Sequence, residues 1–236
     1  MGTPTVTLKK SSRDNICQFC DKGYSSEKTL SSHMCIRKRR YTDKDSPGCK
    51  LGFRIFQRFY ELTTNSKTPK TEMEFIKSKY YLDFVKFARY LIDLEPLACN
   101  LFVDFVLKNG VKMKDWEKSF VYESFLQEYT KKEPVEKALE RTIIEMSAWA
   151  DKTGNNYYDF FRQVNPVEAT YMLRSARISP WVLYLSQSSR ELLGKLNKEQ
   201  GELIASVIDP NFWNKEFSSR LDDALFVKSV LEEAGI

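Results

Sequence analysis

Apolar residues recur every three to four positions over most of the chain. Large aliphatic and aromatic side chains carry this spacing in 51–63 and in 72–93. It continues in further segments, which are 96–110, 114–131, 135–151, 155–164, 166–176, 180–195, 198–208 and 215–234. An interval of three to four places such side chains on one face of a helix. No segment of this part alternates apolar and polar residues with a period of two, so the pattern predicts an all-α body.

Composition divides the chain into four parts. Residues 1–15 are rich in Ser, Thr and Lys and are expected to form a mobile arm. Residues 16–48 are expected to form a small ββα-type zinc finger with a basic tail, ending in the hinge 42–48, which contains Pro and Gly. Residues 49–110 and 111–236 are then two helical subdomains. The chain of 236 residues is long enough to bury such a core.

The segment from Cys17 to His33 carries the most specific chemical pattern. It reads Cys17-x2-Cys20-x3-Tyr24-x5-Leu30-x2-His33, the C2H2 zinc-finger spacing through the first three ligands. Two thiolates on a knuckle and an imidazole on the following helix can converge on one tetrahedral Zn2+. So short a segment buries too little apolar surface to fold alone, so the metal would stabilise it. The alternative is that no metal binds and that these cysteines are ordinary thiols.

The fourth ligand departs from the C2H2 pattern. The positions expected for a second histidine hold Arg37, Lys38 and Arg39, and His33 is the sole histidine of the sequence. Cys35 follows His33 by two positions, about 200° around an ideal helix, so it completes the site only if the helix breaks there. Cys49 would instead close the site through a returning loop. We expect Cys35, with Cys49 or a site lacking a fourth protein ligand as alternatives.

A finger of this type has few means of reading DNA sequence. Its helix positions −1, 3 and 6 are Ser26, Thr29 and Ser32, and position 2 is Lys28. None of the three is an arginine, asparagine or glutamine able to make bidentate contacts with a base. The pattern therefore favours binding without sequence specificity.

Positive charge is concentrated at the front of the chain. Residues 1–50 hold 11 Lys and Arg against 5 Asp and Glu, a net +6, and 51–236 hold 26 against 27, a net −1. A run of four cations at 37–40 is typical either of a solvated surface or of phosphate contact, and beside a zinc module we favour phosphate contact. The residues expected to contact DNA are Lys28, Arg37, Lys38, Arg39, Arg40, Arg54, Arg58, Lys77, Lys79, Lys86 and Arg89.

Motifs of catalysis, export and membrane insertion are not found in the sequence. The sole histidine is assigned to zinc, Gly194-Lys195 lacks the other residues of a phosphate loop, and no Gly-x-Ser-x-Gly occurs. We therefore expect a protein that is not an enzyme. With no long apolar run and no signal-peptide core, we expect no membrane partner and a cytoplasmic location.

Several short stretches of the helical body follow one another in a particular order. They are 51–60, 79–90, 102–107 before Trp116, Phe125 with Tyr129, Asn165-Pro166 with Tyr171, Ile178-Ser179, and Trp213-Asn214. In these stretches and their order the helical body resembles the helicase-assembly proteins, or helicase loaders, of T-even-type bacteriophages. If the chain is phage-encoded, its expected location is the cytoplasm of the bacterial host. The zinc finger is an addition to that family's pattern.

This resemblance implies a two-subdomain, all-α protein whose N-terminal half is similar to an HMG box. It also implies binding to forked or single-stranded DNA, to a single-stranded-DNA-binding protein and to the hexameric replicative helicase, without ATP hydrolysis. The alternative function is a transcriptional or host-takeover regulator, in which the finger binds duplex DNA and the body binds RNA polymerase.

Overall fold

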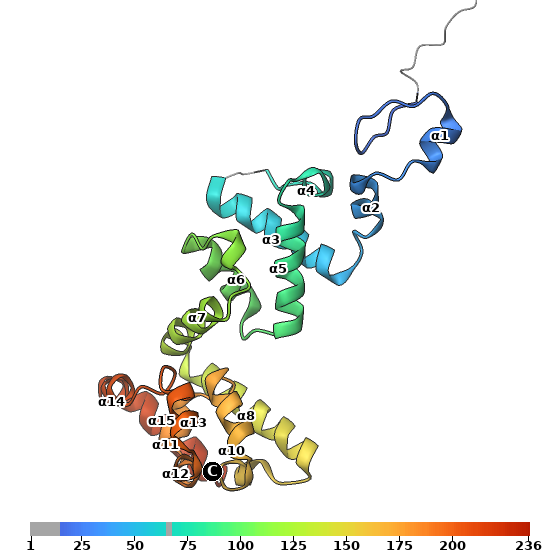
Figure 1. Cartoon of the computed structure of the whole chain (residues 1–236). Coiled ribbons are helices and arrows are strands. Elements are labelled where there is room, and N and C mark those ends of the chain that lie inside the picture. The colour runs from blue at the N-terminus through green and yellow to red at the C-terminus, as the bar shows by residue number, and fades with distance from the viewer. Residues whose placement is uncertain (1–14, 65–67) are drawn as a thin grey trace, which may run out of the picture. The chain divides into compact units, whose positions relative to one another are not determined.

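A computed structural model of the chain describes residues 15–64 and 68–236. These residues form fifteen α-helices and two 3-10 helices, without a β-strand among them (Figure 1). The all-α fold expected from the sequence is therefore confirmed. The expected N-terminal arm, 1–15, lies outside the described residues except for Asn15.

The chain divides into two compact units. Unit 1 comprises Met1–Cys99 and Val103–Glu117, and unit 2 comprises Asn100–Phe102 and Lys118–Ile236. The expected zinc finger belongs to unit 1. The main division follows residue 117, whereas the sequence pattern placed a boundary after residue 110.

Unit 1 contains six α-helices and one 3-10 helix among its described residues. They are α1 (Glu27–Ser32), α2 (Ile36–Thr42), α3 (Pro47–Thr64), α4 (Glu72–Lys77), α5 (Tyr81–Leu94), α6 (Cys99–Lys108) and η1 (Met113–Asp115). The expected hinge at 42–48 is short, because α2 includes Thr42 and α3 already begins at Pro47.

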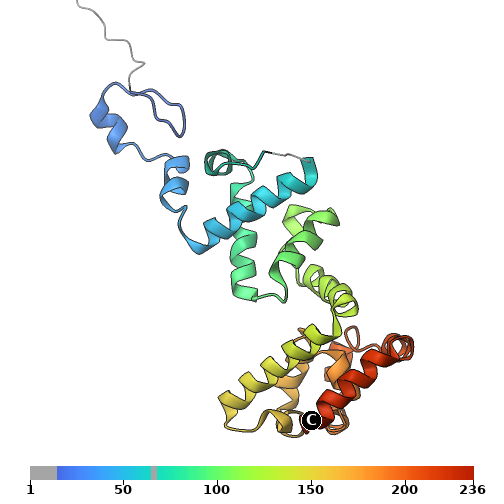
Figure 2. The ribbon, with the colours of Figure 1, turned by 180° about the vertical axis from the view of Figure 1, so that it is seen from behind.

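Helices α3 and α5 cross each other closely in the centre of unit 1 (Figures 1 and 2). The crossing lies at Gly52, where an added Cβ would come within 3.2 Å of the carbonyl oxygen of Phe84. Such a contact would be tighter than most Cβ contacts, so a glycine at this position favours the close approach of the two backbones. Around the crossing, Phe56 packs edge-on against Phe84 at 5.4 Å, and Phe84 packs against Trp116 at the same centroid distance.

The helix expected over 72–93 is interrupted at 78–80, between α4 and α5. The hydroxyl of Ser78 accepts a hydrogen bond of 3.1 Å from the backbone N–H of Tyr80, and this local bond competes with helix continuation. Thr71 and Glu74 form a capping box that begins α4. The apolar period continues across the break, so periodicity alone predicted one helix where there are two.

Unit 2 contains the remaining helices. They are α7 (Ser119–Lys132), α8 (Val135–Thr153), η2 (Tyr157–Asp159), α9 (Phe160–Gln163), α10 (Pro166–Arg174), α11 (Pro180–Leu185), α12 (Ser189–Lys195), α13 (Lys198–Ile204), α14 (Pro210–Ser219) and α15 (Leu221–Glu233). The single helices expected over 180–195 and 215–234 are each divided, at 186–188 and at Arg220.

The core of unit 2 forms where α8, α11 and α15 contact one another. Trp181 and Trp213 pack edge-on at 6.0 Å within it, and the indole N–H of Trp213 donates to the carbonyl of Val207. A buried ion pair lies beside this core. Glu133, whose side chain is 2 % exposed, accepts two hydrogen bonds from Arg141 and a third from the hydroxyl of Tyr129.

Candidate metal centre and nucleic-acid interface

Cys17, Cys20, His33 and Cys35 form one cluster in unit 1. One ligand atom from each residue lies within 4.8 Å of all the others. Tetrahedral coordination with Zn–S distances of about 2.3 Å would place sulfur atoms about 3.8 Å apart, so the cluster is compact enough for one ion. A group of three thiols and one imidazole could hold a metal ion such as zinc. All five cysteines of the chain are free thiols.

The first two ligands lie on a turn that is closed by backbone hydrogen bonds. The N–H of Cys17 donates to Lys22, and the N–H of Asp21 donates to Cys17. Asp21 adopts a left-handed conformation with a φ of 61°, which Asp tolerates better than most residues. One isolated antiparallel bridge, Ile16 to Gly23, takes the place of the two strands expected in a ββα finger.

The other two ligands lie on either side of a helix break. Helix α1 ends at Ser32, and the backbone of His33 is extended, with a ψ of 126°. Cys35 is the N-cap of α2, and its sulfur accepts a hydrogen bond from the N–H of Lys38. The chain therefore turns between His33 and Cys35. This is the break that the Cys35 hypothesis required, and it brings Cys35 to the cluster.

His33 is oriented by Tyr24. The tyrosine hydroxyl lies 2.6 Å from Nδ1 of His33, and Nε2 lies 3.3 Å from the sulfur of Cys20. When Nδ1 carries the proton and donates to Tyr24, the lone pair of Nε2 faces the three sulfur atoms. A hydrogen bond on the outer ring nitrogen is the usual way in which a metal-binding histidine is held.

The chemistry of the cluster fits a closed, structural metal site. Burial by itself would raise the pKa of the Cys17 thiol, but hydrogen bonds with the backbone of Phe19 and Cys20 and with the neighbouring thiols lower it below its ordinary value. This lower pKa favours the thiolate of Cys17, which is the form that binds metal. At Cys20 a hydrogen bond with the backbone of Lys22 lowers the pKa, but burial and the neighbouring thiols raise it overall. Four protein ligands leave no open position for a substrate, as is typical of structural zinc sites.

Cys49, the alternative fourth ligand, lies elsewhere. It is buried in α3, its sulfur is 3.0 Å from the hydroxyl of Tyr81, and the thiol also contacts the carboxylate of Asp43 at 3.4 Å. Its surroundings in unit 1 explain it as a packed, hydrogen-bonded core thiol. The cluster is therefore completed by Cys35.

Three of the four consecutive cations at 37–40 are engaged within unit 1. Arg37 donates to the carbonyl of Phe19 at 3.0 Å and lies 3.7 Å from the carboxylate of Asp21. Lys38 donates to the carbonyls of Ser31 and His33, which end α1. A cation at a helix C-terminus satisfies free carbonyl groups and opposes the negative end of the helix dipole. These two side chains hold the cysteine turn and α1 against α2.

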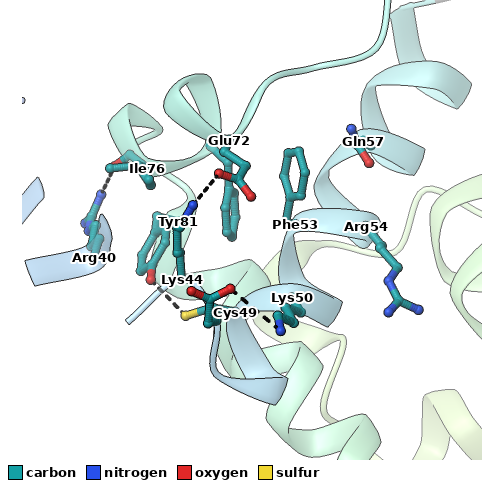
Figure 3. A pocket seen from close by; sticks show the side chains of 12 residues that line it. Arg40, Lys44, Cys49, Lys50, Phe53, Arg54, Gln57, Glu72, Ile76 and Tyr81 are labelled. Atoms are coloured by element: carbon teal, nitrogen blue, oxygen red, sulfur yellow. Dashed lines mark hydrogen bonds and ion pairs between the residues drawn. The ribbon is translucent and has the colours of Figure 1, made fainter. Parts of the chain in front are cut away.

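Arg40 makes the corresponding contact with α4. Its guanidinium donates to the carbonyl of Ile76 and lies 4.4 Å from the ring centroid of Tyr81 (Figure 3). It also donates to the carbonyl of Ser78. Arg39 is exposed, and its guanidinium makes no ion pair or hydrogen bond with the described residues. The run predicted to contact phosphates therefore contributes one unengaged guanidinium, and its other members position the candidate metal centre on the helical body.

The positions expected to read bases are engaged in local bonds. Ser26 is the N-cap of α1, and its hydroxyl accepts from the N–H of Thr29. The hydroxyl of Ser32 donates to the carbonyl of Thr29. Lys28 lies in the first turn of α1, and it is exposed.

The remaining predicted cations differ in how far they are neutralised. Arg58 makes a bidentate pair with Asp104 and a further pair with Glu61, and Lys86 pairs with Glu117 at 3.0 Å. Asp104 and Glu61 raise the pKa of Arg58 through hydrogen bonds. Arg54 and Arg89 are exposed, and neither pairs with a carboxylate among the described residues.

A pocket of about 280 Å³ adjoins Arg40 and Arg54 (Figure 3). Its lysines are neutralised, because Lys44 pairs with Glu72 at 3.2 Å and Lys50 pairs with Asp45 at 3.6 Å. This pocket is therefore a weaker anion site than its number of cations indicates.

A wider cleft of about 580 Å³ lies between α3, α4 and the turn at 78–80. We call it the tyrosine–lysine cleft, and its defining residues are Tyr60, Lys70, Lys77, Lys79 and Tyr80. The Nζ of Lys79 lies 4.7 Å from the ring centroid of Tyr80, and that of Lys70 lies 5.0 Å from the ring of Tyr60. Both tyrosines are half-buried, so part of each ring faces the cleft. Glu74 accepts a hydrogen bond from Lys70 and neutralises that lysine, and the Nζ of Lys77 lies 4.0 Å from the exposed carboxylate of Asp21.

The sequence pattern indicated Lys77 and Lys79 as DNA contacts but not the aromatic half of this cleft. Tyr60 was not singled out, and Tyr80 entered only as part of the apolar period of 72–93, which is typical of packing residues. The dipeptide Lys79-Tyr80 was the available signal, since a cation beside an aromatic ring suits an unstacked base. It could not be interpreted until the break at 78–80 was known.

Charge is distributed unequally between the two units. Residues 1–117 hold 22 Lys and Arg against 14 Asp and Glu, a net +8, whereas 118–236 hold 15 against 18, a net −3. The candidate metal centre and the tyrosine–lysine cleft both belong to the basic unit.

In the described part of the chain, every helix is too short or too polar to cross a membrane. Comparison with protein-family models, with curated proteins and with solved structures finds no significant match to this chain.

Proposed function

We propose that this protein is a non-enzymatic DNA-binding replication factor that holds forked or single-stranded DNA and brings the hexameric replicative helicase to it. The observation that carries the proposal is the tyrosine–lysine cleft, where Lys77 and Lys79 stand beside the half-buried rings of Tyr60 and Tyr80. Proteins bind single strands by combining cations for the phosphates with aromatic rings on which unpaired bases stack. Paired bases in a duplex present no free face to such rings.

The charge of unit 1 supports the same proposal. A net +8 over residues 1–117 attracts a polyanion and speeds its association. The exposed cations Lys28 and Arg54 would extend the phosphate contacts outside the cleft. The hydroxyls of Ser26 and Ser32 are engaged in local bonds, which favours sequence-independent binding over base reading.

We propose Zn2+ as the ion of the candidate metal centre. Three thiolates and one imidazole suit Zn2+ better than the hard cations Mg2+ and Ca2+, which prefer oxygen ligands. Its task would be structural. It would fix the turn at Cys17 and Cys20 against α2, which Arg40 in turn attaches to α4.

The protein partners rest on the resemblance of the helical body to phage helicase loaders. Under this proposal the hexameric helicase and a single-stranded-DNA-binding protein contact the helical body, and the protein hydrolyses no nucleotide. Recruitment is tested by adding the hexameric helicase of the same replication system to fork DNA. The helicase should stay bound to the fork only when the protein is present, and the protein should hydrolyse no ATP in doing so. Equal retention of the helicase without the protein would refute the loader role.

Competition binding tests the DNA preference. A labelled single-stranded 20-mer bound to the full chain should be displaced by unlabelled fork or single strand at lower concentrations than by duplex of the same sequence. The variant Tyr80→Leu should lose most of this preference, because stacking contributes about 1–3 kcal/mol per base. The matched control Tyr158→Leu changes a partly exposed tyrosine of unit 2 and should leave binding unchanged. A chain that prefers duplex would contradict the proposal.

A further inference from the structure

A groove between α2 and α5 differs in character from the tyrosine–lysine cleft. It has a volume of about 470 Å³, and its aliphatic lining comes from Ile36, Leu82 and Val85. Ile36 is 64 % exposed and Leu82 is 62 % exposed. Single exposed apolar residues are ordinary on protein surfaces, but these two come from different helices and line the same groove.

The rim of this groove is positively charged. Four cations, Arg39, Arg40, Lys86 and Arg89, line it against one carboxylate, Asp43, a net +3. Arg40 is engaged with α4, and Lys86 pairs with Glu117. Arg39 and Arg89 are exposed, and their guanidinium groups form neither ion pairs nor hydrogen bonds with the residues that the structure describes. Two guanidinium groups therefore remain available beside an aliphatic floor.

This combination suits a protein ligand better than a nucleic acid. The charged backbone of a nucleic acid gains nothing from contact with aliphatic side chains. Unpaired bases stack on aromatic rings, and the lining of this groove includes only the buried Tyr81. An amphipathic helix presents apolar residues at i and i+4 on one face and can carry carboxylates beside them. Such a helix would cover Ile36 and Leu82 and place carboxylates near Arg39 and Arg89.

We propose that the groove between α2 and α5 docks a short acidic amphipathic helix of a partner protein. Its apolar face lies on Ile36, Leu82 and Val85, and its carboxylates pair with Arg39 and Arg89. This is the helix-in-groove mode of recognition, with charge complementarity selecting an acidic partner. The inference goes beyond DNA binding, because it stands whether or not the tyrosine–lysine cleft holds a single strand.

A second copy of this chain is the competing occupant. Helix α15 exposes Leu221, Leu225 and Phe226 and carries Asp222, Asp223, Glu232 and Glu233. It is itself an acidic helix with exposed apolar residues. Leu221 and Leu225 are spaced i and i+4 on α15, but the next positions on that face are the exposed polar residues Lys228 and Ser229. We favour a different protein because the exposed apolar face of α15 therefore ends after about one turn.

Fluorescence anisotropy with the full chain tests the proposal. The probe is a labelled 18-residue peptide with Leu at helical spacing and Glu at the flanking positions, and the control is a peptide of the same composition in scrambled order. The amphipathic peptide should bind at least tenfold more tightly than the scrambled one. Leu82→Ser should reduce the affinity for the amphipathic peptide at least tenfold. The double variant Arg39→Gln, Arg89→Gln should also bind the peptide more weakly, and its binding should depend less on salt concentration.

Matched controls separate this site from DNA binding. Val167→Ser changes a residue of unit 2 that is 70 % exposed, and it should leave peptide binding unchanged. Leu82→Ser should keep its affinity for a single-stranded 20-mer and its melting temperature, since Leu82 is exposed.

Three results would overturn the proposal. In the first, the scrambled peptide binds as tightly as the amphipathic one. In the second, Leu82→Ser loses binding to the 20-mer but keeps binding to the peptide. In the third, sedimentation velocity shows that the wild-type chain self-associates and that Leu82→Ser does not. The last result would assign the groove to a second copy. Failure of the 20-mer to bind the wild-type chain would count against the proposed DNA function and leave the peptide result unaffected.

Discussion

Nη1 of Arg40 donates a hydrogen bond of 2.9 Å to the carbonyl oxygen of Ile76, in the last turn of α4. The same nitrogen donates to the carbonyl of Ser78 at 3.1 Å, and the guanidinium lies over the ring of Tyr81. This contact joins α2, and with it the candidate metal centre, to the helical part of unit 1. A residue from a run of cations thus acts as a helix cap between two segments far apart in the sequence.

Replacing Arg40 by glutamine should destabilise unit 1. The variant Arg40→Gln loses two hydrogen bonds from a charged donor and the contact with Tyr81, a loss of about 2 kcal/mol. Chemical denaturation of the full chain should show the effect in the transition of unit 1. The control Arg39→Gln removes a neighbouring charge without a partner and should stay within about 0.5 kcal/mol of wild type. Equal stability of the two variants would show that the contact contributes nothing.

Metal content distinguishes the two candidate cysteines. The purified chain should contain one zinc ion, Cys35→Ser should lose it, and Cys49→Ser should retain it, because only Cys35 belongs to the four-residue cluster. Mass spectrometry of bound metal measures this directly. Zinc retained in Cys35→Ser but lost in Cys49→Ser would reverse the assignment.

Tyr24 should tune the affinity of the site for metal. The variant Tyr24→Phe removes the hydroxyl that lies 2.6 Å from Nδ1 of His33, so the imidazole ring loses the hydrogen bond that orients it. Loss of such an outer partner typically costs 10–100-fold in metal affinity. Competition with a chelator measures the change. Tyr41→Phe, which keeps the ring that packs on Phe19, is the control and should bind metal as wild type does.

Asp104 should make unit 1 sensitive to acid. The hydrogen bonds from Arg58 hold the pKa of Asp104 below its ordinary value. The ionised carboxylate of Asp104 therefore contributes its full stabilisation of unit 1 at a pH above about 4, the pKa of an aspartate in the unfolded chain. This contribution is lost as the pH falls through the lower pKa that Asp104 has in the folded chain. Asp104→Asn should lower the free energy of unfolding by about 2 kcal/mol at pH 7 and flatten its decline below about pH 4.

The control for this titration is Asp93→Asn. Asp93 is exposed, and its carboxylate has no ion pair or hydrogen bond with the described residues, so its variant should follow the wild-type curve. An acid limb that is unaltered in Asp104→Asn would assign the pH dependence to other carboxylates.

Salt dependence tests the phosphate contacts of the tyrosine–lysine cleft. Replacing Lys77 and Lys79 together by alanine should reduce the slope of log K against log[salt] by about 1.4, at about 0.7 per lost contact with a single strand. Replacing Lys152 and Lys198, which are 75 % and 91 % exposed on unit 2, should leave the slope unchanged. An equal reduction in both variants would indicate a general effect of charge rather than a site.

Much of the helical content was predictable because burial imposes a local period. The apolar spacing in 135–151 predicted α8 closely, since that helix runs without interruption from Val135 to Thr153. The same spacing predicted continuous helices across 78–80 and 186–188, and these two predictions were wrong. There the hydroxyls of Ser78 and Ser189 bond to the nearby backbone. Those bonds interrupt the backbone without altering the apolar period.

The metal cluster was largely predictable for a similar reason. Ligand type and spacing identified Cys17, Cys20 and His33, because two close thiols and a later imidazole are what a small site requires. The choice between Cys35 and Cys49 depended on where α1 ends, and the sequence left it open. The fold decided it by extending the chain at His33 and by burying Cys49 against Tyr81.

The sequence by itself determined that the chain is helical, that its front is basic and that a group of thiols and one imidazole could gather there. These properties follow from the order and spacing of nearby residues. Tertiary structure alone decided which cations remain available, because Arg37 and Arg40 bond to carbonyls of Phe19 and Ile76, which only folding brings near them. It likewise placed Tyr60 beside the lysines of its cleft, since α3 and α4 come together through packing rather than through local sequence.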